Sequence, residues 1–178
     1  MSKYLNYILF FLFSLSLVSK TVVPENIKTN TDFTYKQLSK VDFSNSDLSE
    51  ANFENAQLAD ANMNNATLYI AGQRTITNLK NANLAGVDFS NVNLYKVIFE
   101  NANLVNANFT NAKLINTDLV NANLRNANVS GATFTNVKVA APEGSRQKHA
   151  YLVSLEQLKK LGVIWEEGKQ PIVIGTAR

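Results

Sequence analysis

The segment from Asn101 to Ser130 reads NANLVNANFT NAKLINTDLV NANLRNANVS, and a large apolar residue returns at every fifth position. We call these apolar residues anchors; most are preceded, two positions earlier, by a small residue that is usually alanine. Outward from this segment, the same period runs in two blocks, with anchors at Phe33, Leu38, Phe43, Leu48, Phe53, Leu58, Met63 and Leu68, then at Leu79, Leu84, Phe89, Leu94, Phe99, Leu104, Phe109, Leu114, Leu119, Leu124, Val129, Phe134 and Val139. Because each repeat is one structural unit, this period takes precedence over local propensity in predicting the fold.

A five-residue period fits neither an α-helix nor a β-strand. Two inward and three outward residues per unit suit a chain that bends after every short extended segment. Coils built from such segments can stack at the usual spacing of hydrogen-bonded strands, and only stacking buries the apolar side of each unit. The sequence therefore predicts an all-β solenoid with internal ladders of Leu and Phe, and with small residues where the walls converge on a narrow core.

The repeat resembles the motif A(D/N)LXX of the pentapeptide-repeat family. Matching units are Ala51-Asn52-Phe53-Glu54-Asn55, Ala102-Asn103-Leu104-Val105-Asn106 and Ala122-Asn123-Leu124-Arg125-Asn126, and the resemblance covers residues 31–139. It implies a right-handed quadrilateral β-helix with four pentapeptides per coil. On that geometry the first block forms two coils and the second a little over three. Asparagine recurs two positions after many anchors, which predicts coil corners, because Asn tolerates left-handed backbone.

The period breaks at residues 69–78, where no anchor is found between Leu68 and Leu79. Either a one-residue bulge shifts the register of a coil, or a small loop projects between the two blocks. Because loops on a regular scaffold often carry function, Arg74 near the centre of this segment is a candidate contact residue.

The N-terminal residues differ from the repeats. Residues 1–19 combine Lys3 with the apolar run Ile8–Val18 and the small residues Ser14, Ser16 and Ser19, which is the layout of a secretory signal peptide. We expect export to the periplasm or out of the cell; the alternative is an uncleaved N-terminal anchor. Residues 20–30 are expected to form a linker or cap on the first coil.

Residues 140–178 are expected to cap the other end, because open solenoid ends present unpaired strand edges. Ser154 to Gln157 has the pattern of a capping box, which predicts a short helix ending near Gly162. The stretch from Pro171 to Ile174 can add a strand. An additional possibility for this region is homodimerisation.

The composition offers little for catalysis. The chain has no cysteine and a single histidine, His149, in a basic stretch outside the repeats. No nucleophile motif, metal-ligand spacing or glycine-rich phosphate loop accompanies it. We therefore expect neither an enzyme nor a bound cofactor or metal.

The charge pattern bears on one known activity of the resembled family, in which an acidic solenoid imitates DNA and occupies DNA gyrase. A duplex mimic needs a strongly negative surface. Residues 31–139 carry nine acidic and eight basic side chains, and the whole chain has a net charge of +3. Neither number favours DNA mimicry or nucleic-acid binding, so gyrase inhibition is kept as the alternative to a binding function.

Outward positions should be polar, so apolar residues there are candidate contacts; they are Tyr69, Tyr95, Ile98, Val105, Ile115 and Val120. Tyr95 and Ile115 are twenty residues apart and should stack on consecutive coils, with Ile98 beside the neighbouring corner. Such a patch suits a protein partner. The sequence thus predicts an exported, non-catalytic solenoid that acts as a rigid protein-interaction scaffold, with candidate contacts Tyr95, Ile98, Ile115 and Arg74.

Overall fold

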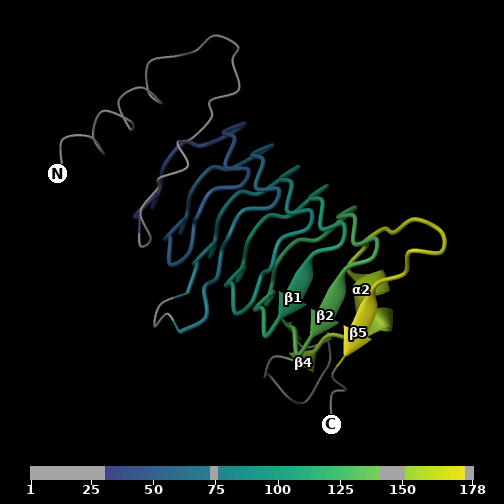
Figure 1. The fold of residues 1–178 in the computed structure, drawn as a ribbon. Coiled ribbons are helices and arrows are strands. Elements are labelled where there is room, and N and C mark those ends of the chain that lie inside the picture. The colour runs from purple at the N-terminus through teal and green to yellow at the C-terminus, as the bar shows by residue number, and fades with distance from the viewer. Residues whose placement is uncertain (1–30, 73–75, 141–150, 175–178) are drawn as a thin grey trace, which may run out of the picture.

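The computed structural model describes residues 31–72, 76–140 and 151–174, in which short extended segments stack as successive coils along one axis (Figure 1). Residues twenty apart pair in parallel, as Asp32 does with Asn52, so each repeat coil contributes four extended segments. The paired residues define four faces. Face 1 holds Asp32, Asn52, Asn78, Ile98, Asp118 and Lys138; face 2 holds Gln37, Gln57, Asn83, Asn103 and Asn123; face 3 holds Asp42, Asn62, Asp88, Asn108, Asn128 and Ile164; face 4 holds Asp47, Thr67, Asn93, Lys113, Thr133 and Ile172.

The core consists of the predicted anchors. Every anchor from Phe33 to Val139 is at most 4% exposed, which confirms the five-residue period as the burial pattern. Phenylalanine rings stack across coils, with the Phe89 and Phe109 centroids 5.4 Å apart, and Phe99 packs edge-on to both. Dispersion and apolar burial along this ladder therefore tie each coil to the next.

The corners between segments are tight turns with left-handed backbone. At Asn106 φ is 59°, and the amide of the following residue, Ala107, donates to the Leu104 carbonyl at 3.1 Å. Most corners after residue 78 carry asparagine with positive φ, as the sequence predicts. Tyr35 and Lys96 occupy equivalent corners, so the geometry favours asparagine without requiring it.

The break between the two blocks is an insertion of six residues, not a one-residue bulge. Asn52 pairs with Asn78, twenty-six residues away, whereas pairs within either block are twenty apart. Leu79 therefore continues the same face as Phe53, and the register is regular on both sides. Thr77 is 1% exposed, and its hydroxyl donates to the carbonyls of Leu68 at 2.7 Å and Leu48 at 3.1 Å. This side chain closes the corner that the insertion interrupts.

Replacing Thr77 with valine should lower the free energy of unfolding by about 1 to 2 kcal/mol, because the isosteric side chain leaves the Leu68 carbonyl buried without this donor. Urea denaturation followed by circular dichroism measures the change. Thr117→Val is the matched control: the Thr117 hydroxyl donates to the Leu94 carbonyl, which also accepts from the Val97 amide. An equal loss in both variants would contradict the special role of Thr77.

Beyond the repeats, non-repeat sequence continues the coil. Strands β1 (Lys113–Ile115), β2 (Thr133–Thr135) and β5 (Ile172–Ile174) form a parallel sheet on face 4, and β3 (Lys138–Val139) pairs antiparallel with β4 (Tyr151–Leu152). Helix α2 (Leu155–Lys160) begins with the predicted capping box of Ser154 and Gln157 and buries Leu158. The amide of Asn126 donates to the carbonyl of Gly162, so the segment after the helix joins the stack. At the right of Figure 1, α2 and β5 lie against the last repeat coil.

Within the described residues, no helix is long and apolar enough to cross a membrane. The predicted signal peptide (1–19) and the linker (20–30) lie outside the described residues.

Candidate interaction surface

A column of large side chains runs along face 4, one from each of three successive coils. Tyr69 and Tyr95 have their ring centroids 4.3 Å apart and tilted by 44°. The pairing of Asn93 with Lys113 places Ile115 at the next step of the same column. All three side chains are half-buried. The expected stacking of Tyr95 and Ile115 is thus present, and Tyr69 extends it.

Two lysines border this column. The Nζ atom of Lys96 lies 5.2 Å from the centroid of the Tyr95 ring, a cation–π geometry. Lys113 lies in β1, two residues before Ile115, and its side chain is exposed. The column is therefore an apolar strip with positive charge along it.

Ile98 lies on the face that follows face 4, across the corner from Tyr95. Ile98 belongs to face 1, in the row of Asn78 and Asp118, and is half-buried there. The corner at Lys96 separates it from Tyr95. Arg74 and His149 lie outside the described residues.

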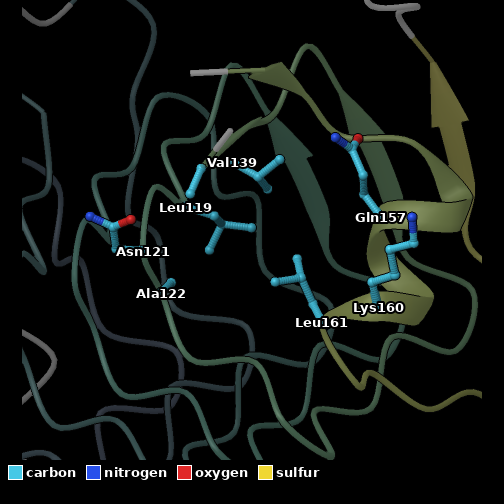
Figure 2. A pocket seen from close by; sticks show the side chains of 8 residues that line it. Leu119, Asn121, Ala122, Val139, Gln157, Lys160 and Leu161 are labelled. Atoms are coloured by element: carbon cyan, nitrogen blue, oxygen red, sulfur yellow. The ribbon is translucent and has the colours of Figure 1, made fainter. Parts of the chain in front are cut away.

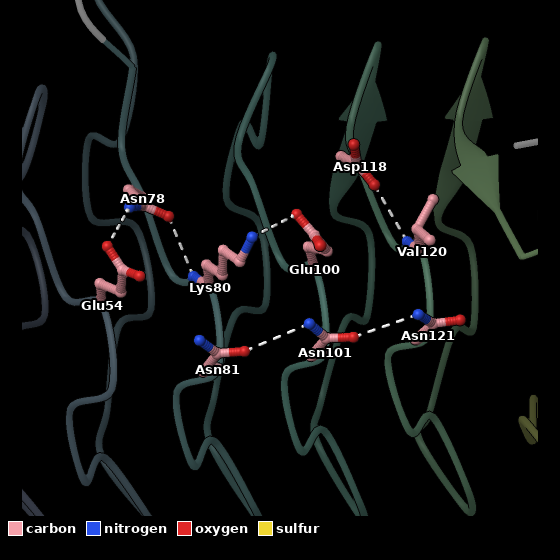
Figure 3. Close-up of polar contacts among 9 residues, drawn as sticks. All are labelled: Glu54, Asn78, Lys80, Asn81, Glu100, Asn101, Asp118, Val120 and Asn121. Carbon is pink, nitrogen blue, oxygen red and sulfur yellow. Dashed lines mark hydrogen bonds and ion pairs between the residues drawn. The ribbon is translucent and has the colours of Figure 1, made fainter.

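Polar side chains of face 1, the face that also holds Ile98, form a ladder (Figure 3). The Nζ atom of Lys80 is 2.9 Å from Oε2 of Glu100. This hydrogen bond and the charge of Glu100, with smaller contributions from Glu54 and Asp118, raise the pKa of Lys80 above its ordinary value of 10.5. Since the raised pKa belongs to the folded state, the pair stabilises the fold below about pH 10.5, and this contribution is lost as the pH rises through the folded pKa.

Replacing Glu100 with glutamine should lower the pKa of Lys80, because it removes the charged acceptor of the ammonium group. The contribution of Lys80 to the loss of stability at alkaline pH should then shrink, because its folded pKa returns toward the unfolded value. NMR titration of the Lys80 side chain measures the pKa. Glu156→Gln, which removes the partner of Lys160 on α2, is the control and should leave the Lys80 titration unchanged; an unchanged titration in Glu100→Gln would refute the assignment.

The asparagines at the corners and on the faces are largely bonded to one another. At the corner after face 1, the Asn101 amide donates to Asn81 Oδ1 at 3.3 Å, and the Asn121 amide donates to Asn101 Oδ1 at 3.2 Å (Figure 3). On the faces, asparagine carbonyls accept from the backbone two residues on, as Asn103 does from the Val105 amide. Among the described residues, no buried side-chain polar atom is left without a partner. These ladders therefore serve the fold and do not present a free set of ligand donors.

A pocket of about 200 Å³ lies at the C-terminal end, between the last repeat coil and α2 (Figure 2). Leu119, Val139 and Leu161 give it an apolar wall, while Gln157 and Lys160 stand at its edge. Lys160 is already paired with Glu156 at 3.0 Å. The pocket has no nucleophile beside a base, and among the described residues no group of histidine and carboxylate side chains is placed to hold a metal ion.

Sequence reasoning missed two exposed residues: Ile70 next to the tyrosine column, and Ile172 further along face 4 beyond β2. Ile70, at the start of the insertion, is 40% exposed, and Ile172, in β5, is 57% exposed. Ile172 joins face 4 by pairing with Thr133. Ile172 lies outside the repeats, so the five-residue period could not identify it as an outward residue. Ile70 could have been identified, because it stands two positions after the anchor Leu68, where the period predicts an outward side chain.

Comparison with known proteins agrees with the five-residue repeat. A family model described as pentapeptide repeats matches residues 37–69, 77–111 and 102–138 in eight copies, which is more than half of the chain. No curated protein matches.

Solved structures of similar proteins include three from photosynthetic organisms. A pentapeptide repeat protein (Rfr23) from the cyanobacterium Cyanothece is 22% identical, with 72% of this chain and 93% of that chain covered and a TM-score of 0.57. HetL from Nostoc, a pentapeptide repeat protein involved in heterocyst differentiation regulation, is 21% identical, with 72% of this chain and 67% of that chain covered and a TM-score of 0.45. A pentapeptide repeat protein of the Arabidopsis thaliana thylakoid lumen is 30% identical, with 75% of this chain and 85% of that chain covered and a TM-score of 0.38. The first likeness supports the fold alone. From the family model and the stacked five-residue units, this chain belongs to the pentapeptide-repeat family.

Proposed function

We propose that this protein is an exported, right-handed quadrilateral β-helix that acts as a non-catalytic binding module for a protein partner. The observation that carries the proposal is the column of Tyr69, Tyr95 and Ile115, because large apolar side chains occupy outward positions of three successive coils. Tyrosine supplies much of the binding energy in protein interfaces, since its ring is large, rigid and amphipathic. The stacked core keeps these side chains in fixed positions, so little conformational entropy is lost on binding.

The distribution of charge favours this function over DNA mimicry. Imitation of a duplex requires rows of carboxylates, but on face 1 Lys80 lies in the same row as Glu54 and Glu100 and is paired with Glu100. On face 4, Lys96 and Lys113 border the tyrosine column. Neither face presents an uninterrupted negative strip.

Replacing Tyr95 with aspartate should leave the fold intact but weaken partner binding, or self-association if the partner is a second copy, by about tenfold or more. The half-buried ring lies outside the anchor core, so circular dichroism and thermal unfolding should change little. Partner binding is measured by immobilising the protein, exposing it to the exported fraction and quantifying the captured proteins by mass spectrometry. Self-association is measured by sedimentation velocity. Val105→Asp is the matched control, since Val105 is a half-buried outward residue on face 2. Unchanged assembly and capture in Tyr95→Asp would remove the tyrosine column as the binding site.

The location of the protein is tested separately. Export predicts that cell fractionation recovers the chain outside the cytoplasm, and that its intact mass corresponds to a start near Lys20. A full-length chain in the cytosol would overturn export and make a gyrase supercoiling assay the next experiment. A homodimer through the C-terminal region, also proposed from the sequence, predicts twice the chain mass in sedimentation velocity.

A further inference from the structure

Face 4 differs from the neighbouring face 3 in its chemistry. From Tyr69 to the end of β5, its segments are ATLYI (66–70), VNLYK (92–96), AKLIN (112–116), ATFTN (132–136) and PIVI (171–174), and these hold no aspartate or glutamate. Face 3 runs beside it and has the opposite character: its outward side chains are Asp, Asn, Ser and Thr in the repeat coils. They bond one another, as when Asn108 donates to Asp88 Oδ1 at 3.0 Å. Face 4 therefore offers larger outward apolar side chains than face 3.

The apolar side chains of face 4 extend over several coils. Tyr69, Tyr95 and Ile115 are each half-buried, and the Tyr69 and Tyr95 rings contact one another. Ile70 at one end and Ile172 at the other are the more exposed members. The outward residues Thr133 and Thr135 of β2 separate Ile115 from Ile172, so the apolar area consists of the column with Ile70 and, one coil further on, Ile172. A cluster of outward apolar side chains such as the column is a mark of an interaction site on a soluble protein.

The charge of face 4 indicates what can cover it. No ion pair among the described residues uses Lys96 or Lys113, and both lie beside the apolar column. A surface that covered the column would desolvate these ammonium groups, which is costly unless carboxylates meet them. Two copies of face 4 packed together would bring like charges into contact. A lipid surface is a poorer fit, because binding to it needs side chains that insert below the headgroups.

We propose that face 4 is the docking surface for a partner protein whose contact patch is apolar and bordered by aspartate or glutamate side chains. This inference rests on the proposed binding function and adds the face and the chemistry of the partner. Tyr95 would supply contact area, and Lys96 and Lys113 would select for acidic partners through charge complementarity.

The test uses a random-peptide display library selected on the purified protein, with enriched peptides resynthesised for fluorescence anisotropy. Three proteins are compared: wild type, the double variant Lys96→Glu with Lys113→Glu, and the control Lys40→Glu with Arg125→Glu. The control changes the net charge by the same amount as the double variant, but on face 2. Lys40 occupies a corner with φ of 64°, close to the 59° of Lys96. We expect acidic, apolar peptides that bind wild type and control alike and bind the face 4 variant about tenfold or more weakly.

The remaining outcomes separate the inference from the proposed function. Enriched peptides that are basic or neutral, or that bind the face 4 variant as tightly as wild type, would overturn this inference and leave a binding module with another site. No enrichment above an empty support would overturn both. Co-sedimentation with vesicles of phosphatidylcholine and phosphatidylglycerol that is lost in the face 4 variant would replace the protein partner with a membrane.

Discussion

Replacing Phe109 with alanine is expected to lower the free energy of unfolding by about 3 to 5 kcal/mol, the largest effect of any single change considered. Phe109 is fully buried, stacks on Phe89 with centroids 5.4 Å apart and packs edge-on against Phe99 at 6.3 Å. Two terms contribute to this loss of stability. The variant no longer gains the free energy of burying the aromatic ring, and it leaves a cavity that the paired coils cannot close. Urea denaturation monitored by circular dichroism measures it.

The control for this variant is Thr110→Ala, the adjacent residue on the outside of the same segment. Its hydroxyl donates to Asn108 Oδ1 at 2.6 Å on a face exposed to water. Its loss should therefore cost no more than about 1 kcal/mol. If Phe109→Ala cost no more than this control, the phenylalanine ladder would not be what joins the coils.

Replacing Ala107 with leucine is expected to cost roughly 2 to 3 kcal/mol through overpacking. Ala107 is fully buried, two positions before Phe109, where the other repeat coils on face 3 carry Val41, Ala61, Val87 and Ala127. Valine already occurs in this column, so Ala107→Val is the graded control and should cost clearly less. The same denaturation experiment orders the variants. A leucine variant as stable as the valine variant would show that the corner has free volume.

The five-residue period made most of the fold predictable. Burial of the anchors follows directly from their spacing, because every inward position is occupied by a residue of the same kind. The helix start was also readable, since the capping box of Ser154 and Gln157 is a local signal. The path of the chain after α2 was not, because the pairing of Ile164 with Asn128 and of Ile172 with Thr133 joins residues without a shared motif.

The candidate surface was only partly predictable, and the insertion explains why. Counting twenty residues from Tyr69 reaches the buried anchor Phe89, so the sequence gives no sign that Tyr69 stacks on another tyrosine. The pairing of Thr67 with Asn93 restores the alignment and brings Tyr69 to Tyr95. The stacking of Tyr95 and Ile115 lies within one block and could be predicted. The partner chemistry required the whole of face 4, including β5, whose register comes only from the structure.

The six-residue insertion before Thr77 also has a consequence for how such a protein can diversify. The coils before and after the insertion stay aligned on face 1: Asn78 pairs with Asn52 of the preceding coil and with Ile98 of the following coil. Thr77 closes the interrupted corner from within. The number of residues at this corner can thus change without a change in the register of the coils. The entropic cost of closing a longer loop grows only slowly with its length. The corner after Leu68 is accordingly a natural graft site, where foreign peptides can be displayed on an unaltered scaffold.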